Sequence, residues 1–313
     1  MHHSPSSSEI ISPLPPSNNT QLINWDTPSH PNAPYPRLDE DAKDRSGYCS
    51  TGGSTVVSLE ETPLRATLSR HFTANIDTTH TDIILIICGF VGGLVDGLSF
   101  NAWGSFSSMQ TGNTVFIALG VSGQPAYPSY LWAKSLIALT VFITSNILFI
   151  HVSRALSPRR RSTLILSFGV QTAALLAAAI LVQLGIIDPK PEDPRAPIEW
   201  MQILPISLLS FQAGGQIIAS RVLGFDEIPT VVLTTLLCDL LVDPKLTAKA
   251  NPKRNRRVGA FLALFLGAMT AGGLSKVTEM AASLWFAMGL KLTITVGLFV
   301  WRAERERKSD IEG

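Results

Sequence analysis

Long apolar runs recur along the chain between about residue 83 and residue 301. An α-helix needs roughly 17–25 mostly apolar residues to cross the hydrocarbon core of a bilayer. Such a pattern predicts an all-α fold, a polytopic membrane helical bundle that sits in the lipid bilayer. Six runs are long enough to be transmembrane helices: 83–103, 131–151, 163–187, 201–222, 257–276 and 281–301.

Two further apolar segments, about 106–121 and 228–242, are shorter and polar at their starts. The second also carries Asp239, so neither makes a comfortable span. In chain order the eight pieces read long, short, long, long, and then the same again. This order predicts a tandem repeat of a four-element unit, with halves at about 82–187 and 200–302.

The charges of the loops predict how the halves are oriented. Lys and Arg collect in cytoplasmic loops, and the loops at 152–162 and 243–257 are strongly basic, whereas 188–200 is mainly acidic. If both short segments re-enter the membrane without crossing it, the basic loops share one side and both chain ends are cytoplasmic. The halves then form an inverted repeat, with the re-entrant segments dipping from opposite faces. A crossing by 106–121 would instead give seven spans and an external N-terminal arm, an alternative that the sequence leaves open.

The first 80 residues differ from the rest of the chain. Only 22 of them are hydrophobic, against about half of the remaining residues, and nine prolines occur up to Pro63. Segments of this kind bury too little apolar surface to offset chain entropy. The sequence therefore predicts a disordered polar arm (1–80), a transmembrane domain (81–302) and a charged cytoplasmic tail (303–313).

Composition excludes several classes of function. The 313 residues are 46% hydrophobic and 16% charged with a net charge of +1, so there is no basic field for a nucleic-acid partner. Three cysteines are too few and too scattered for a disulfide framework or a zinc site. No GxSxG elbow, P-loop or intramembrane His/Asp/Glu cluster occurs in the sequence. We therefore expect no enzyme, no cofactor and no metal.

Charged residues inside the spans are the first candidates for chemistry. Asp96 lies beside a face of small residues, Gly89, Gly93 and Gly97, that allows a neighbouring helix to approach closely. A carboxylate inside a membrane is costly and is functional by default, although one near the interface can also snorkel or cap a helix. Lys291, near the middle of the last span, is the predicted partner of Asp96. Such an ion pair either only stabilises the fold or takes part in gating or coupling of transport.

Uncharged polar residues complete the candidate set. Gln212 and Gln216 lie one turn apart, and they could line a polar cavity with Gln110 and Asn113 or form interhelical hydrogen bonds. In Thr111-Gly112-Asn113 the glycine permits unwinding, while the polar side chains could satisfy freed backbone groups or coordinate a solute; a helix N-cap is the other reading. The candidate substrate or coupling residues are Asp96, Ser99, Gln110, Thr111, Gly112, Asn113, Gln212, Gln216, Thr234 and Lys291.

The run from Asp96-Gly97-Leu98-Ser99 through Phe106 to Thr111-Gly112-Asn113 resembles the signature of the YoaK-like family of multi-spanning membrane proteins. The resemblance covers about 82–302 and leaves the arm outside. It implies a fold with six or so helices in a domain of unknown function, and it implies no substrate or reaction. Where family members tend to show a Thr-Gly pair, this chain has Thr234-Thr235.

Together these features predict a secondary transporter or permease for a small polar or anionic solute. The alternative is a non-catalytic membrane scaffold whose arm recruits partners. Either protein would reside in the plasma membrane or an endomembrane, and a homo-oligomer is compatible with both.

Overall fold

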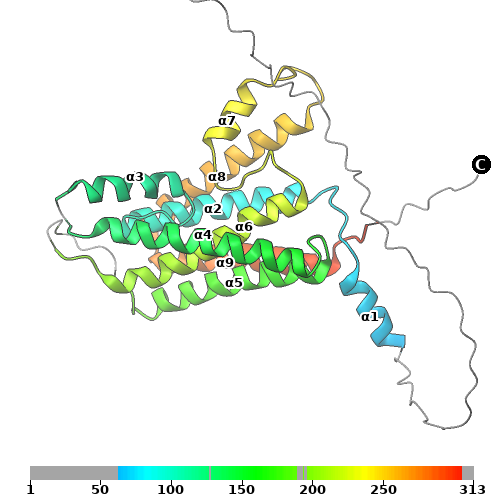
Figure 1. Ribbon diagram of the computed structural model, residues 1–313, viewed down its shortest axis with the longest axis horizontal. Helices are drawn as coiled ribbons and strands as arrows, with labels where there is room; N and C mark the ends of the chain where they lie inside the picture. Colours follow the sequence, from blue (N-terminus) through cyan, green and yellow to red (C-terminus); the bar gives the residue numbers. More distant parts are fainter. Residues whose placement is uncertain (1–62, 127, 189–192, 194–195, 305–313) are drawn as a thin grey trace, which may run out of the picture. The chain divides into compact units, whose positions relative to one another are not determined.

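The computed structural model describes residues 63–126, 128–188, 193 and 196–304. Within these ranges the chain is helical and contains no strand (Figure 1). The helices are α1 (Pro63–Thr73), α2 (Asp82–Trp103), α3 (Gln110–Val121), α4 (Leu131–Ala155), α5 (Arg161–Gln183), the 3-10 helix η1 (Trp200–Gln202), α6 (Ile203–Leu223), α7 (Thr234–Leu241), α8 (Pro252–Val277) and α9 (Met280–Val300).

Six of these helices are long and apolar enough to cross a membrane: α2, α4, α5, α6 with η1, α8 and α9. This confirms the six predicted spans. α4 and α8 turn most of their apolar side chains outward, among them Ile143, Ile147, Phe265 and Met269. Large apolar side chains exposed over whole helix faces match a hydrocarbon surrounding, so these faces contact lipid.

The two short helices follow spans that end at opposite ends of the bundle, and α3 lies beside α4 as α7 lies beside α8 (Figure 1). α3 has 12 residues, a length of only about 18 Å, so it does not span. Each follows a sharp reversal of the chain, because α2 ends at Gly104 (φ 75°) and α6 ends at Gly224 (φ 79°). Glycine suits this left-handed conformation. We call residues 104–121 the first hairpin and 224–241 the second hairpin.

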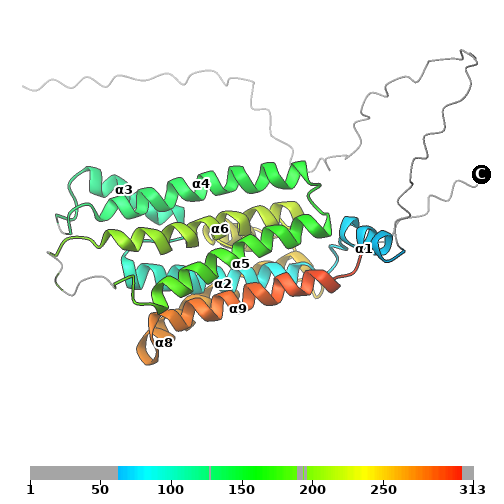
Figure 2. The same cartoon turned by 90° about the horizontal axis from the view of Figure 1, so that it is seen from below.

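The two halves of the bundle are inverted copies that interlock. α2 and α6, which open the two halves, run in opposite directions (Figures 1 and 2). α2 packs against α8 as α6 packs against α4, and α5 packs against its counterpart α9. The cap glycines 104 and 224 place the halves 120 residues apart. The predicted inverted repeat is therefore present.

Small residues allow α2 and α8 to touch through their backbones. A Cβ atom added to Gly93 would lie 2.0 Å from the carbonyl oxygen of Leu264, and one added to Gly267 would lie 2.0 Å from that of Phe90. Because the obstructing atoms are backbone, side-chain movement cannot relieve the overlap. The predicted small-residue face of α2 thus serves close helix packing.

Gly93→Ala should lower the stability of the bundle by about 1–3 kcal/mol, the usual cost of overpacking a tight interface. Gly297→Ala on α9 is the matched control, because nothing lies within 4 Å of the added atom. There the better helix propensity of alanine should leave stability unchanged or raise it by up to about 1 kcal/mol. Thermal unfolding of the two variants in detergent measures the difference, and equal midpoints would contradict the backbone contact.

The two ends of the described chain meet at one end of the bundle. Ile76 bridges Ala303, the backbone N–H of Asp77 donates to the carbonyl of Arg302 (2.9 Å), and Asn75 bridges Arg160. This end also carries the predicted basic loops at 152–162 and 243–257, so we call it the basic end. The arrangement matches a topology in which both termini of the domain lie on one side of the membrane.

The last part of the predicted disordered arm is folded, whereas the first span begins at Asp82, next to the predicted boundary at residue 80. Residues 63–73 form α1, which packs against α5, and the His71 ring Nε2 hydrogen-bonds to the carbonyl of Phe299 (2.8 Å). These residues belong to the folded unit, although their polar composition resembles that of the arm. The predicted disorder of 1–62 and the predicted tail from 305 onward lie outside the described residues.

Candidate functional site

Asp96 holds the first hairpin inside the bundle. Its Oδ1 accepts hydrogen bonds from the backbone N–H of Ser107 (2.9 Å), the Ser107 hydroxyl (3.0 Å) and the backbone N–H of Ser108 (2.7 Å). Its Oδ2 accepts from the Ser108 hydroxyl. Asp96 lies eight residues before Gly104, or about 12 Å along the helix. Because Ser107 and Ser108 bond to it, the chain after Gly104 turns back into the bundle as far as Asp96 before α3 begins. The carboxylate thus fixes a re-entrant backbone by charge-assisted hydrogen bonds.

Asn113 completes this arrangement from α3. Its side-chain oxygen accepts from the backbone N–H of Phe106 (3.1 Å), and its amide donates to the Phe106 carbonyl (2.7 Å) and to Gln110 Oε1 (2.9 Å). Ser99 donates to the carbonyl of Ser105 (2.8 Å). Backbone groups that α3 cannot satisfy are therefore bonded by side chains, as irregular backbone at membrane depth requires.

The predicted pairing of Asp96 with Lys291 is wrong. Asp96 bonds to the first hairpin, while Lys291 donates to Gln171 Oε1 (2.7 Å) and approaches Cys88 Sγ at 3.7 Å. The carboxylate finds four donors in the nearby hairpin, which the helical pattern of α2 alone does not show. The two intramembrane charges therefore occupy separate sites.

Lys291 is the centre of a buried polar cluster from four helices. We call Cys88, Gln171, Gln216 and Lys291, together with Gln212 one helical turn before Gln216 on α6, the central cluster. Each of the five side chains is fully buried. Gln216 donates to the backbone carbonyl of Cys88 (2.8 Å), and Lys291 also lies over the ring of Phe168, 5.4 Å from its centre. Within the described residues no carboxylate forms an ion pair with Lys291, so its neighbours there are neutral.

Several polar atoms near the central cluster lack a hydrogen-bond partner among the described residues. Both polar atoms of Gln212, Oε1 of Gln216 and the hydroxyl of Thr230 are buried and unpaired. Thr230 belongs to the second hairpin, and its carbonyl oxygen would lie 3.0 Å from a Cβ added to Gly92, close to the Gln216 amide. Unpaired buried polar groups cost about 1–3 kcal/mol each, and these four atoms have hydrogen-bonding capacity that no described residue uses.

The central cluster lies on the axis that relates the two halves. Gln171, near the middle of α5, and Lys291, near the middle of α9, are 120 residues apart and bond to each other. Asp96 and Gln216 are also 120 residues apart, and each lies at the depth that the hairpin of its own half reaches. The two halves thus share one geometry. In each of these two equivalent pairs only one residue is charged, Asp96 in the first half and Lys291 in the second.

Three predicted site residues do not join either group. Thr111 and Thr234 are exposed. Gly112 lies inside the first turn of α3, where an added Cβ would be 2.8 Å from the Phe106 ring. Neither an unwound helix at Gly112 nor a threonine N-cap is observed, because Met109 occupies the N-cap position without a side-chain bond. Gly112 instead allows the Phe106 ring to pack on α3.

Sequence reasoning missed Gln171 and Lys134. Lys134, near the start of α4, is 2% exposed and donates to Gln202 Oε1 and to the Trp103 carbonyl (3.4 Å). A lysine just inside a predicted span was a usable signal for Lys134. No signal distinguished Gln171 from other polar residues on spans, since its role depends on the register between α5 and α9.

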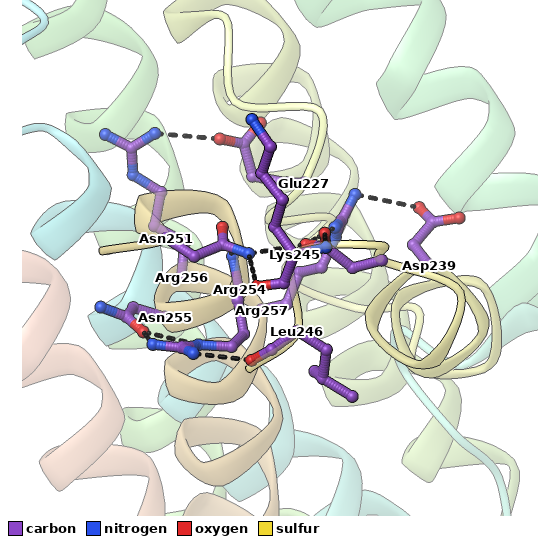
Figure 3. Close-up of polar contacts among 10 residues, drawn as sticks. Glu227, Asp239, Lys245, Leu246, Asn251, Arg254, Asn255, Arg256 and Arg257 are labelled. Carbon is purple, nitrogen blue, oxygen red and sulfur yellow. Dashed lines mark hydrogen bonds and ion pairs between the residues drawn. The ribbon is translucent and has the colours of Figure 1, made fainter. Parts of the chain in front are cut away.

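Ion pairs hold the second hairpin to α8 at the basic end (Figure 3). Arg256 bonds to Glu227 (3.0 Å) and to Asp82 (3.0 Å), and Arg257 lies 3.8 Å from Asp239 and 3.6 Å from Asp243. The second hairpin is therefore held by partly exposed ion pairs at the basic end, whereas the first hairpin is held by the intramembrane Asp96.

The contribution of Asp243, which follows the second hairpin and pairs with Arg257, should depend on pH only in acid. Hydrogen bonds from the Asn251 side chain and the Lys245 backbone N–H, with the charges of Arg257 and Arg254, lower the pKa of Asp243 from 3.8. A lowered folded-state pKa contributes stability above the unfolded value of about 3.9, and this is lost as the pH falls through the folded value. The difference in unfolding temperature between wild type and Asp243→Asn should therefore stay constant from about pH 7 to 5 and vanish in stronger acid. A difference that shrinks between pH 7 and 5 would contradict this assignment.

No group of three His, Cys, Asp or Glu side chains in the described residues could hold a metal ion. The chain matches the family described as "Protein of unknown function (DUF1275)" over residues 84–297, about two thirds of its length. No curated protein and no solved structure matches the chain. The matched region begins within α2 and ends within α9, so it contains both hairpins and the central cluster and confirms the family predicted from the Asp96–Asn113 signature. The chain therefore belongs to the DUF1275 family of proteins of unknown function.

Proposed function

We propose that the protein is a secondary transporter, and not an enzyme, that moves a small anionic solute through the central cluster. Secondary transporters of inverted-repeat design bind their solutes near the membrane midplane, between broken segments that belong to the two repeats. Here two hairpins enter the bundle from opposite ends, and the central cluster lies at mid-depth. Both ends of the domain and the basic loops would face the cytoplasm.

The observation that carries the proposal is the unbalanced charge of Lys291. A buried ammonium without a paired anion is costly, and its neighbours Gln171, Cys88 and Phe168 carry no negative charge. A solute anion would supply that charge, and the unpaired amide of Gln212 would donate further hydrogen bonds. The central cluster is closed in this structure, because all its side chains are buried. Binding and release would therefore need movement of a hairpin or of one half against the other.

Uptake into proteoliposomes tests the proposal. The purified protein is reconstituted and offered radiolabelled chloride, nitrate, bicarbonate, acetate, phosphate and sulfate, with glucose and glycine as uncharged and zwitterionic controls. We expect saturable uptake of at least one anion and none of the two controls. Absence of protein-dependent flux for every anion, in vesicles where the protein is folded, would refute the proposal.

A further inference from the structure

A cavity of about 460 Å³ opens at the basic end, away from the central cluster. Its walls are the last turns of α4 and α6, the turn at 157–159 and the segment before α2. That volume is more than ten times the roughly 30 Å³ that a water molecule occupies in the liquid. The residues that line it are Asn75, Ile150, Arg154, Ser157, Pro158, Arg159, Arg221 and Val222.

Among the residues that the structure describes, three guanidinium groups line this cavity and no carboxylate does. Arg221 pairs with Asp226 at 2.7 Å, but both side chains are largely exposed, and such pairs contribute about 0–1 kcal/mol. Within the described part of the chain, the Arg159 side chain makes only a long hydrogen bond, from Nε to the Val222 carbonyl (3.4 Å). Arg154 forms no ion pair with any described residue. Most of the donor capacity of the three arginines is therefore free to bind an anion.

The cavity is built on a fixed backbone. The backbone N–H of Ile76 donates to the carbonyl of Arg159 (3.1 Å), and that of Arg161 donates to the carbonyl of Ala74 (3.0 Å). Ser157 adopts a left-handed conformation (φ 71°) that turns the chain between α4 and α5. These contacts hold the turn against the segment before α2. The backbone of Arg159, which lies in this turn, is therefore already fixed before a ligand binds.

We infer that this cavity binds a phosphate group, and that the phosphate belongs to the headgroup of an anionic lipid. Guanidinium groups bind phosphate oxygens in paired, charge-assisted hydrogen bonds. The cavity lies at the ends of α4, whose apolar side chains face the lipid, and of α6, which is mostly buried in the bundle. The ends of spans lie at the level of lipid headgroups, and basic pockets between spans on the cytoplasmic side bind such headgroups. Ile150 and Val222 add an apolar wall for the part of the lipid next to its headgroup.

Native mass spectrometry of the full chain in detergent tests this inference with dioleoyl phosphatidic acid, dioleoyl phosphatidylcholine and soluble glycerol 3-phosphate as probes. We expect selective binding of phosphatidic acid over phosphatidylcholine, and a loss of about tenfold or more in Arg154→Gln, as for a lost hydrogen bond to a charged group. Lys249→Gln is the control, because it removes one exposed positive charge from the same end outside the cavity.

Equal losses in the two variants would overturn the site, since they would indicate general attraction to the basic end. Absence of selectivity for phosphatidic acid would overturn it as well. Glycerol 3-phosphate that binds as tightly as phosphatidic acid, at the same arginine, would overturn the lipid source in favour of a soluble phosphate. Glycerol 3-phosphate that binds at least tenfold more weakly would support the lipid headgroup.

Discussion

Asp96→Ala should release the first hairpin and destabilise the protein by about 3–5 kcal/mol, because four neutral donors lose a charged acceptor at once and each unpaired buried donor costs about 1–3 kcal/mol. The substitution leaves two backbone N–H groups and two hydroxyls, on Ser107 and Ser108, without their acceptor. Buried donors that lose their partner pay the full desolvation cost. Denaturant unfolding in detergent measures the loss, and hydrogen exchange over residues 104–110 should rise at the same time.

Two controls distinguish the carboxylate from its surroundings. Asp96→Asn keeps the shape and one acceptor oxygen, so its loss should lie between that of Asp96→Ala and zero. Thr111→Ala changes an exposed residue of the same family signature and should remain within about 0.5 kcal/mol of wild type. If Asp96→Ala and Thr111→Ala behaved alike, Asp96 would not be the residue that holds the hairpin.

Lys291→Met should lower anion uptake by about 10–100-fold at anion concentrations below saturation while leaving the fold intact. Replacing a buried charge by an apolar side chain of similar volume is often neutral or stabilising. Among the described residues Lys291 pairs with no carboxylate, so the substitution leaves no opposite charge buried without its partner. The loss of one charge-assisted contact to the solute should lower its affinity by about 10–100-fold. Flux and unfolding temperature measured on the same preparation separate the two effects.

Lys276→Met, which removes an exposed lysine from the last turn of α8, is the control for that experiment. It should retain wild-type flux. Wild-type flux in Lys291→Met, or a collapse of its unfolding temperature, would show that Lys291 has a structural role rather than a solute-binding one.

The fold was largely predictable because the bilayer constrains it so strongly. A spanning segment must be long, apolar and helical, so the six spans follow from run length, and the relative orientation of the halves follows from loop charge. The spacing of Gly89, Gly93 and Gly97 predicted that a neighbouring helix approaches α2 closely, and the structure identifies that helix as α8. The structure of residues 63–80 was harder to predict from the sequence, because α1 packs through individual contacts such as the hydrogen bond from His71 and not through an apolar stripe.

The site was predicted less completely, because its contacts depend on chain reversal and on the register between the halves. Asp96 was identified because a carboxylate inside a membrane costs free energy. Its partners become apparent only once the chain reverses at Gly104, and the sequence does not reveal the φ angle of a glycine. Lys291 was likewise recognised, but its partner Gln171 lies 120 residues earlier. Only the exact register of α5 against α9 brings that pair together.

Access to Cys88 tests the central claim, that a buried midplane site opens to each face in turn. Cys88 is a buried native thiol of the central cluster, so replacing Cys49 and Cys238 by serine leaves it as the only thiol. A membrane-impermeant anionic methanethiosulfonate is added to one face of proteoliposomes at a time. We predict modification from both faces, slowed by a saturating concentration of the transported anion. Modification from neither face or from one face only, in protein whose Cys88 reacts fully once unfolded, would contradict the account.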